Sequence, residues 1–157
     1  MQDTIDRLVA QHQDQPGAML PLLHAVQDEL GYIPPSAVAA IARALNLSSA
    51  EVHGVISYYH HFRSTPPGEH VVQVCRAEAC KAMGADALWA HACTHTGVAP
   101  AAALHGATCS DGSVTLQPVY CLGLCATAPA MLLDERLHAR VSPEEFDRLL
   151  QAARSAA

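Results

Sequence analysis

The chain has 157 residues, of which 50% are hydrophobic and 15% are charged, with a formal net charge of -6 at pH 7. This composition supports a buried core and excludes an intrinsically disordered protein, and the negative charge without any cluster of lysines and arginines argues against nucleic-acid binding. No apolar run approaches the roughly 20 residues that span a bilayer, and the N-terminus has no signal pattern, so we expect a cytoplasmic protein without membrane insertion.

The first sixty residues predict a series of amphipathic helices, because apolar residues recur at spacings of three and four. The first helix is expected to follow Asp3 as its N-cap. The second is expected to begin at Pro21 and to end at Gly31. Ser48 and Glu51 predict a capping box at the start of a later helix. Short connections between these segments indicate a compact helical bundle.

A Pro- and Gly-rich segment, RSTPPGE at residues 63–69, begins where the helical pattern ends. We place a domain boundary there, which gives a helical part at residues 1–65 and a second domain at residues 66–157.

The second domain predicts alternating strands and helices. A helix from about residue 81 to 95 is expected to end at Gly97, and a last helix is expected to begin with Ser142 as N-cap and Glu145 closing a capping box. Strands are expected at residues 70–74, soon after Gly97, and at 113–119, 131–133 and 137–141.

Four of the six cysteines fall into two short loops, and each loop follows a predicted strand. The first loop contains Cys75 and Cys80, and the second contains Cys121 and Cys125. The cytoplasm keeps thiols reduced, so these cysteines are better interpreted as metal ligands than as disulfides. Gly123 would let the second loop approach a bound group closely. We therefore expect a site with four thiolate ligands.

The spacing of these cysteines leaves three interpretations open. The pairs have four and three intervening residues and are separated by forty, which is wider than the tight knuckles of most zinc ribbons. This favours a two-iron cluster, while a structural zinc ion and buried or transiently oxidised thiols remain alternatives.

Three segments together resemble a known family: HAVQDELGYIPPSAVAAIARALNLSSAEVHGVISYYHHF, then VCRAEAC, then YCLGLCATAPAM. They are similar to the thioredoxin-like [2Fe–2S] subunits of respiratory complex I, of NAD-reducing hydrogenases and of NAD-dependent molybdenum formate dehydrogenases. The resemblance implies an α+β fold, with an N-terminal helical bundle followed by a thioredoxin-like [2Fe–2S] ferredoxin domain. It also implies that Cys75, Cys80, Cys121 and Cys125 bind the cluster.

The resemblance further implies a non-catalytic electron-transfer subunit of an oxidoreductase complex. Its partner would be a flavin-binding NADH-dehydrogenase-type subunit that carries FMN and binds NAD. The Cys-Arg-Ala-Glu-Ala-Cys loop is most similar to formate dehydrogenase gamma subunits, which implies a larger iron–sulfur subunit with the molybdenum cofactor. A hydrogenase module and complex I are the alternative parents. A zinc-stabilised interaction module and a thiol-redox protein are the alternatives outside electron transfer.

The remaining chemically active residues predict no catalytic site. Cys93 and Cys109 are interpreted as small buried side chains. His91 and His95 have a spacing that could hold a metal, but no acidic third ligand accompanies them in sequence, so a solvated helix face is expected. Arg76 and Lys81 beside the proposed ligands would raise the cluster's reduction potential, unless they are ordinary solvated charges.

Overall fold

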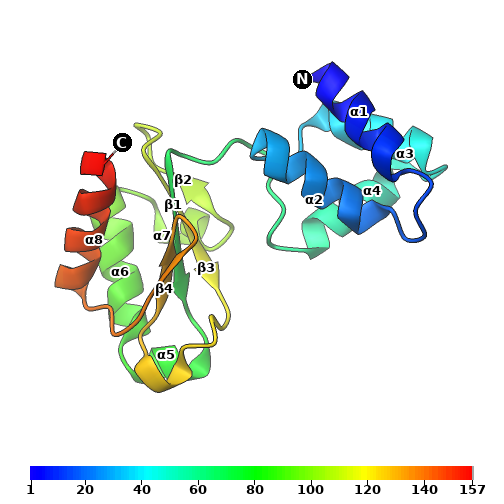
Figure 1. The fold of residues 1–157 in the computed structure, drawn as a ribbon. Helices are drawn as coiled ribbons and strands as arrows, with labels where there is room; N and C mark the ends of the chain where they lie inside the picture. Colours follow the sequence, from blue (N-terminus) through cyan, green and yellow to red (C-terminus); the bar gives the residue numbers. More distant parts are fainter. Residues whose placement is uncertain (157) are drawn as a thin grey trace. The chain divides into compact units, whose positions relative to one another are not determined.

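The computed structural model describes residues 1–156 and divides the chain into two compact units, Met1–Pro66 and Pro67–Ala157 (Figure 1). Each unit has a hydrophobic core of its own. We describe the two units separately.

The first unit is helical. Apolar residues on one side of each helix form its core, which includes Ile5, Leu22 and Ile41. Such a one-sided apolar pattern forces helices to pack against each other. The helices are α1 (Gln2–His12), α2 (Met19–Leu30), α3 (Pro35–Ala44) and α4 (Ser49–Tyr58).

Local sequence signals explain most of these helix ends. Gly31 takes the left-handed conformation at the end of α2, with φ of 80°, as predicted. The capping box of Ser48 and Glu51 is also confirmed. The prediction for Asp3 was wrong: α1 begins at Gln2, and Asp3 lies in its first turn, where an acidic side chain still favours the helix dipole. Similarly, α2 begins at Met19, two residues before Pro21. Proline has no backbone N–H, but it is tolerated in the first turn because the N–H groups there have no partner within the helix.

The second unit contains a five-stranded mixed sheet, which confirms the α+β class. The strand order is β2-β3-β1-β4-β5, and β1 runs parallel to β3, while the other neighbours are antiparallel. The elements in chain order are β1 (His70–Cys75), α5 (Glu78–Ala82), α6 (Ala85–Thr96), α7 (Pro100–Ala103), β2 (Ala107–Thr108), β3 (Val114–Val119), the 3₁₀ turn η1 (Cys125–Thr127), β4 (Met131–Leu133), β5 (Arg136–His138) and α8 (Pro143–Ala156).

Helices α6 and α8 pack side by side against the sheet (Figure 1). Their inner faces and the strands share one core, in which Val74, Leu88, Leu116 and Phe146 are fully or almost fully buried. This core fixes the end of β1 and the end of β3 relative to each other.

The structure corrects four predicted elements of this unit. The last strand, expected at residues 137–141, is β5 and ends at His138. The helix expected at residues 81–95 is two helices, α5 and α6, separated at Gly84, where φ is 99°. The strand expected soon after Gly97 is preceded by the short helix α7 and has only two residues. Ser142 does cap α8, but Glu145 pairs its carboxylate with Arg148, so the structure shows only half of the predicted capping box.

Among the described residues 1–156, no helix combines the length and the apolar character that crossing a membrane requires.

Candidate metal centre

The parallel pairing of β1 and β3 brings the two cysteine loops to one edge of the sheet. Cys75, the last residue of β1, pairs with Val119, the last residue of β3. The carboxyl ends of parallel strands meet at the same edge, so the loops that follow them are neighbours. The Cys75 N–H also donates to the Ala130 carbonyl over 3.0 Å, which ties the end of the second loop to the first.

The two cysteines of the first loop are buried. Cys75 is 1% exposed and Cys80, on α5, is 2% exposed. They pack with Ala85, Ala128 and Ala130 in a small cluster separate from the main core. Two loops that are distant in sequence therefore share one apolar environment around these thiols.

The two cysteines of the second loop lie at the surface. Their sulfurs are 3.8 Å apart, and the Gly123 N–H points at the Cys121 sulfur over 3.4 Å. Gly123 has φ of 78°, a left-handed conformation that suits glycine. Cys121 itself has φ of 96°, which is unusual for a residue with a side chain. Such strained backbone is concentrated at functional sites.

The pKa values show that thiols from both loops influence one another. Burial would raise the pKa of Cys75, but N–H groups of Ala77 and of the second loop, together with the Cys80 thiol, lower it. For Cys80, burial and the neighbouring Cys75 raise the pKa. For Cys125, the adjacent Cys121 raises it, with a smaller effect of Cys75. A positively charged metal group would offset the unfavourable effect that neighbouring thiolates have on one another, because it stabilises all the thiolates at once.

This donor set fits an iron–sulfur cluster. Four cysteine sulfurs are the usual ligands of a two-iron cluster, and backbone N–H groups directed at sulfur stabilise its negative charge. The same four sulfurs would also satisfy one tetrahedral zinc ion.

Arg76, the residue after Cys75, is not an ordinary solvated charge. Its side chain is 19% exposed, pairs with Asp86 over 2.9 Å and lies over the Trp89 ring at 5.0 Å. These contacts hold a positive charge next to the first cysteine loop. Lys81, by contrast, is exposed on α5.

The other two cysteines lie in the main core of the unit, apart from the cluster that contains Cys75 and Cys80. Burial raises the pKa of Cys93, which keeps this thiol protonated and unreactive. Cys109 is 8% exposed, and its thiol donates to the Asp111 carboxylate over 2.8 Å. All six cysteines are free thiols.

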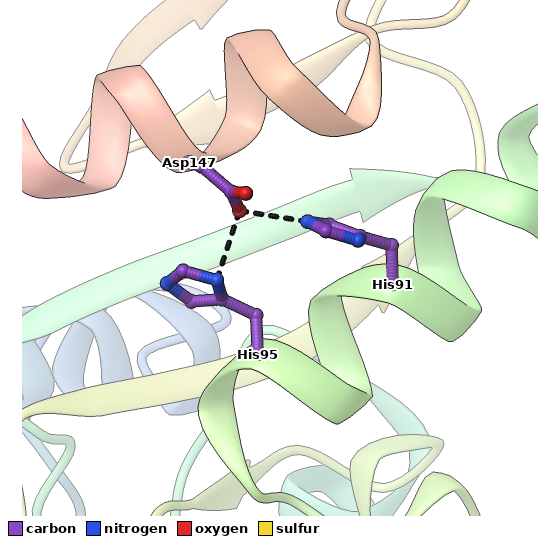
Figure 2. A group of neighbouring side chains, drawn as sticks. All are labelled: His91, His95 and Asp147. Atoms are coloured by element: carbon purple, nitrogen blue, oxygen red, sulfur yellow. Dashed lines mark hydrogen bonds and ion pairs between the residues drawn. The ribbon is translucent and has the colours of Figure 1, made fainter.

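His91 and His95 do not lie on the simple solvated helix face that was expected, because an acidic side chain from another helix contacts both. Asp147, from α8, lies between the two rings of α6 (Figure 2). The sequence offers little signal for this contact: Asp147 follows Phe146, which lies in the core, and only the packing of α8 on α6 reveals its neighbours.

The sequence profile of the thioredoxin-like [2Fe–2S] ferredoxin family matches residues 5–154. The chain therefore belongs to this family.

Its relatives are subunits of larger NAD-linked enzymes. It is 36% identical to a subunit of the NADH-quinone oxidoreductase of Mycobacterium tuberculosis, with 94% of this chain and 57% of the relative aligned. The chain thus spans a little over half the length of the mycobacterial relatives it matches. It is 32% identical to the corresponding NADH-quinone oxidoreductase subunit of Escherichia coli, with 95% of this chain and 87% of that protein aligned.

Among solved structures, a chain of an NAD⁺-reducing [NiFe]-hydrogenase in the air-oxidised state has a similar fold. The TM-score is 0.69 at 25% identity, over 85% of this chain and 23% of that chain.

Proposed function

We propose that this chain is an electron-transfer subunit that holds one [2Fe–2S] cluster through Cys75, Cys80, Cys121 and Cys125. The observation that carries the proposal is the parallel pairing of β1 and β3, which brings both cysteine loops to one sheet edge. When bound, such a cluster accepts and releases one electron at a time.

Protein groups around the thiols have distinct tasks in this proposal. Cys75 and Cys80 anchor the site from the buried side, where few motions are available to them. Cys121 and Cys125 face the surface, so a partner's electron carrier can come close. The N–H of Gly123 and the charge of Arg76 stabilise negative charge on the sulfurs and on the site as a whole.

The surface beside the thiols supports a protein partner. Met83 and Tyr120 are 63% and 65% exposed, and they flank the first and second cysteine loops in sequence. Exposed large apolar side chains next to a functional site are typical of a surface that another subunit covers. We propose that this partner is a flavin-binding NADH-dehydrogenase-type subunit with FMN and NAD, since the relatives are named as parts of NADH-quinone oxidoreductases. Free thiols agree with the reducing cytoplasm as the compartment.

For the parent complex we propose an NAD-dependent formate dehydrogenase with a larger molybdenum and iron–sulfur subunit. The support is the Cys-Arg-Ala-Glu-Ala-Cys loop at residues 75–80. A second parent, NADH-quinone oxidoreductase, is favoured by the mycobacterial and Escherichia coli relatives.

The experiment is reconstitution of the purified chain with candidate flavin subunits and their larger partners. We expect formate-dependent NAD⁺ reduction by the full complex and no NADH oxidation by this chain alone. Hydrogen-dependent NAD⁺ reduction would assign it to a hydrogenase, and NADH-quinone activity would assign it to complex I. A colourless protein with zinc on the four cysteines would contradict the electron-transfer proposal.

A further inference from the structure

Helices α6 and α8 bring together three metal-binding side chains away from the cysteine loops. His91 and His95 lie one turn apart on α6, and Asp147 faces both from α8 (Figure 2). Asp147 Oδ1 is 2.7 Å from His91 Nε2 and 2.9 Å from His95 Nδ1. One carboxylate oxygen therefore contacts a nitrogen of each of the two imidazole rings.

The spacing of these atoms suits a small divalent cation. The three ligand atoms all lie within 4.8 Å of one another. Donors around a tetrahedral zinc ion, with bonds of about 2.0–2.1 Å, are roughly 3.3 Å apart. The two separations from Asp147 Oδ1, 2.7 and 2.9 Å, are a few tenths of an ångström shorter than this value, so small rotations of the three side chains would admit an ion between them.

The rings are held in place but remain reachable. Phe146 packs edge-on against both imidazoles, with ring centroids 6.0 Å from His91 and 5.8 Å from His95. The side chains of His91, His95 and Asp147 are 32%, 33% and 41% exposed, so an ion can enter from solvent. Packing thus supplies the preorganisation that a metal site needs.

The local charge also favours a cation. Glu144 lies one turn before Asp147, and its pKa is lowered mainly by a hydrogen bond with Ser142 and to a smaller extent by His91. Its carboxylate is therefore ionised near His91. The nearest basic residue on α8, Arg148, pairs with Glu145.

We propose that His91, His95 and Asp147 form a binding site for a divalent transition-metal ion, with zinc as the expected ion, which joins α6 to α8. Two imidazoles and one carboxylate are a common donor set for zinc, and the remaining position can take water. The site shares no ligand with the four cysteines. The ion stabilises the packing of α8, because it binds only when both helices are in contact.

The test is equilibrium dialysis of the anaerobically purified full chain against zinc, followed by metal analysis of zinc and iron. We expect one zinc ion per chain at this site, and at least about tenfold weaker binding in the variants H91Q, H95Q and D147N. These substitutions keep hydrogen-bonding groups and lie at partly exposed positions, so they should fold. The control H105Q replaces an exposed histidine elsewhere in the same unit and should bind zinc normally.

The deciding quantity is the difference in bound zinc between wild type and D147N. It is independent of whether the four cysteines hold a cluster, since zinc on thiols would be the same in both proteins. Zinc should also raise the unfolding temperature of the wild type by more than that of D147N, while circular dichroism shows both to be folded. Equal zinc binding by wild type and D147N would overturn the proposal and leave only the contacts of Asp147 with the two histidines that Figure 2 draws.

Discussion

The proposed cluster site contains a buried pair and an exposed pair of cysteine side chains, and the two pairs have different roles. The buried pair, Cys75 and Cys80, gains rigidity from the alanines packed around it. The exposed pair, Cys121 and Cys125, lies on a loop with two left-handed residues. The first pair fixes the position of a bound group, and the second leaves it close to the surface.

Replacing any one of the four loop cysteines by Ser should abolish or severely weaken the visible absorption of the cluster, because a hydroxyl is a poor substitute for a thiolate ligand. The matched controls are Cys93→Ala and Cys109→Ala, which remove buried thiols outside the site. Absorption spectra of the anaerobically purified variants provide the measurement. Loss of the cluster in a control variant would show that the ligands are assigned incorrectly.

Gly123→Ala should destabilise the second loop and reduce cluster content. No atom would crowd the added Cβ, but φ of +78° costs a side-chain-bearing residue about 1–2 kcal/mol. The measurement is iron per chain after mild chelator treatment. Gly54→Ala is the control, since this glycine lies within α4 with open space around it and the change should stabilise that helix by up to about 1 kcal/mol. Equal iron retention in Gly123→Ala and wild type would contradict the role given to Gly123.

At the scale of single elements, local signals and tertiary packing determine different features. The capping box at Ser48 and the stop at Gly31 depend on neighbours in sequence, and both were predictable. The break at Gly84 was not, because an isolated glycine inside a helical pattern is often tolerated. The left-handed backbone of Cys121 had no signal, since its residue type does not prefer that conformation.

Ser48→Ala should lower the free energy of unfolding of the helical unit by about 1 kcal/mol, because it removes the side chain that accepts the Glu51 N–H. The neighbour Ser49→Ala, at an exposed first-turn position, should have little effect. Urea unfolding of the full chain, followed by circular dichroism, provides the comparison.

The same cap should depend on pH. Hydrogen bonds from the Ser48 backbone and side chain lower the pKa of Glu51 below its ordinary value of 4.5. Its contribution is therefore fully present above pH 4.5 and is lost as the pH falls through the lowered pKa. The difference between wild type and Ser48→Ala should shrink at acid pH, and a difference that grows there would contradict the capping box.

For the whole molecule, the pairing of distant loops is the feature that sequence could only partly predict. The spacing predicted that Cys75 and Cys80 form one pair of ligands and that Cys121 and Cys125 form another. Whether the two loops lie next to each other depends on the register in which β1 pairs with β3. Asp147 was missed for the same reason, since its partners lie on another helix. The two units have separate cores, and the domain boundary expected near residue 65 stays a prediction.

Removing residues 1–66 should leave a folded, coloured protein, because the second unit has its own core and all four loop cysteines. The shortened chain should associate more weakly with the flavin subunit, since it keeps Met83 and Tyr120 but loses Tyr58 and Tyr59, which are 75% and 42% exposed and are further candidate contacts. Size-exclusion chromatography with the flavin subunit is the measurement. Association of unchanged strength would show that the helical unit makes no contact with the flavin subunit.

The central claim, one two-iron cluster on four cysteines, is tested most directly by metal and sulfide analysis of the full chain purified without oxygen. The account predicts about two iron atoms and two acid-labile sulfides per chain, and an electron paramagnetic resonance signal after reduction with dithionite. A protein with one zinc ion on the four cysteines, no sulfide and no such signal would contradict it.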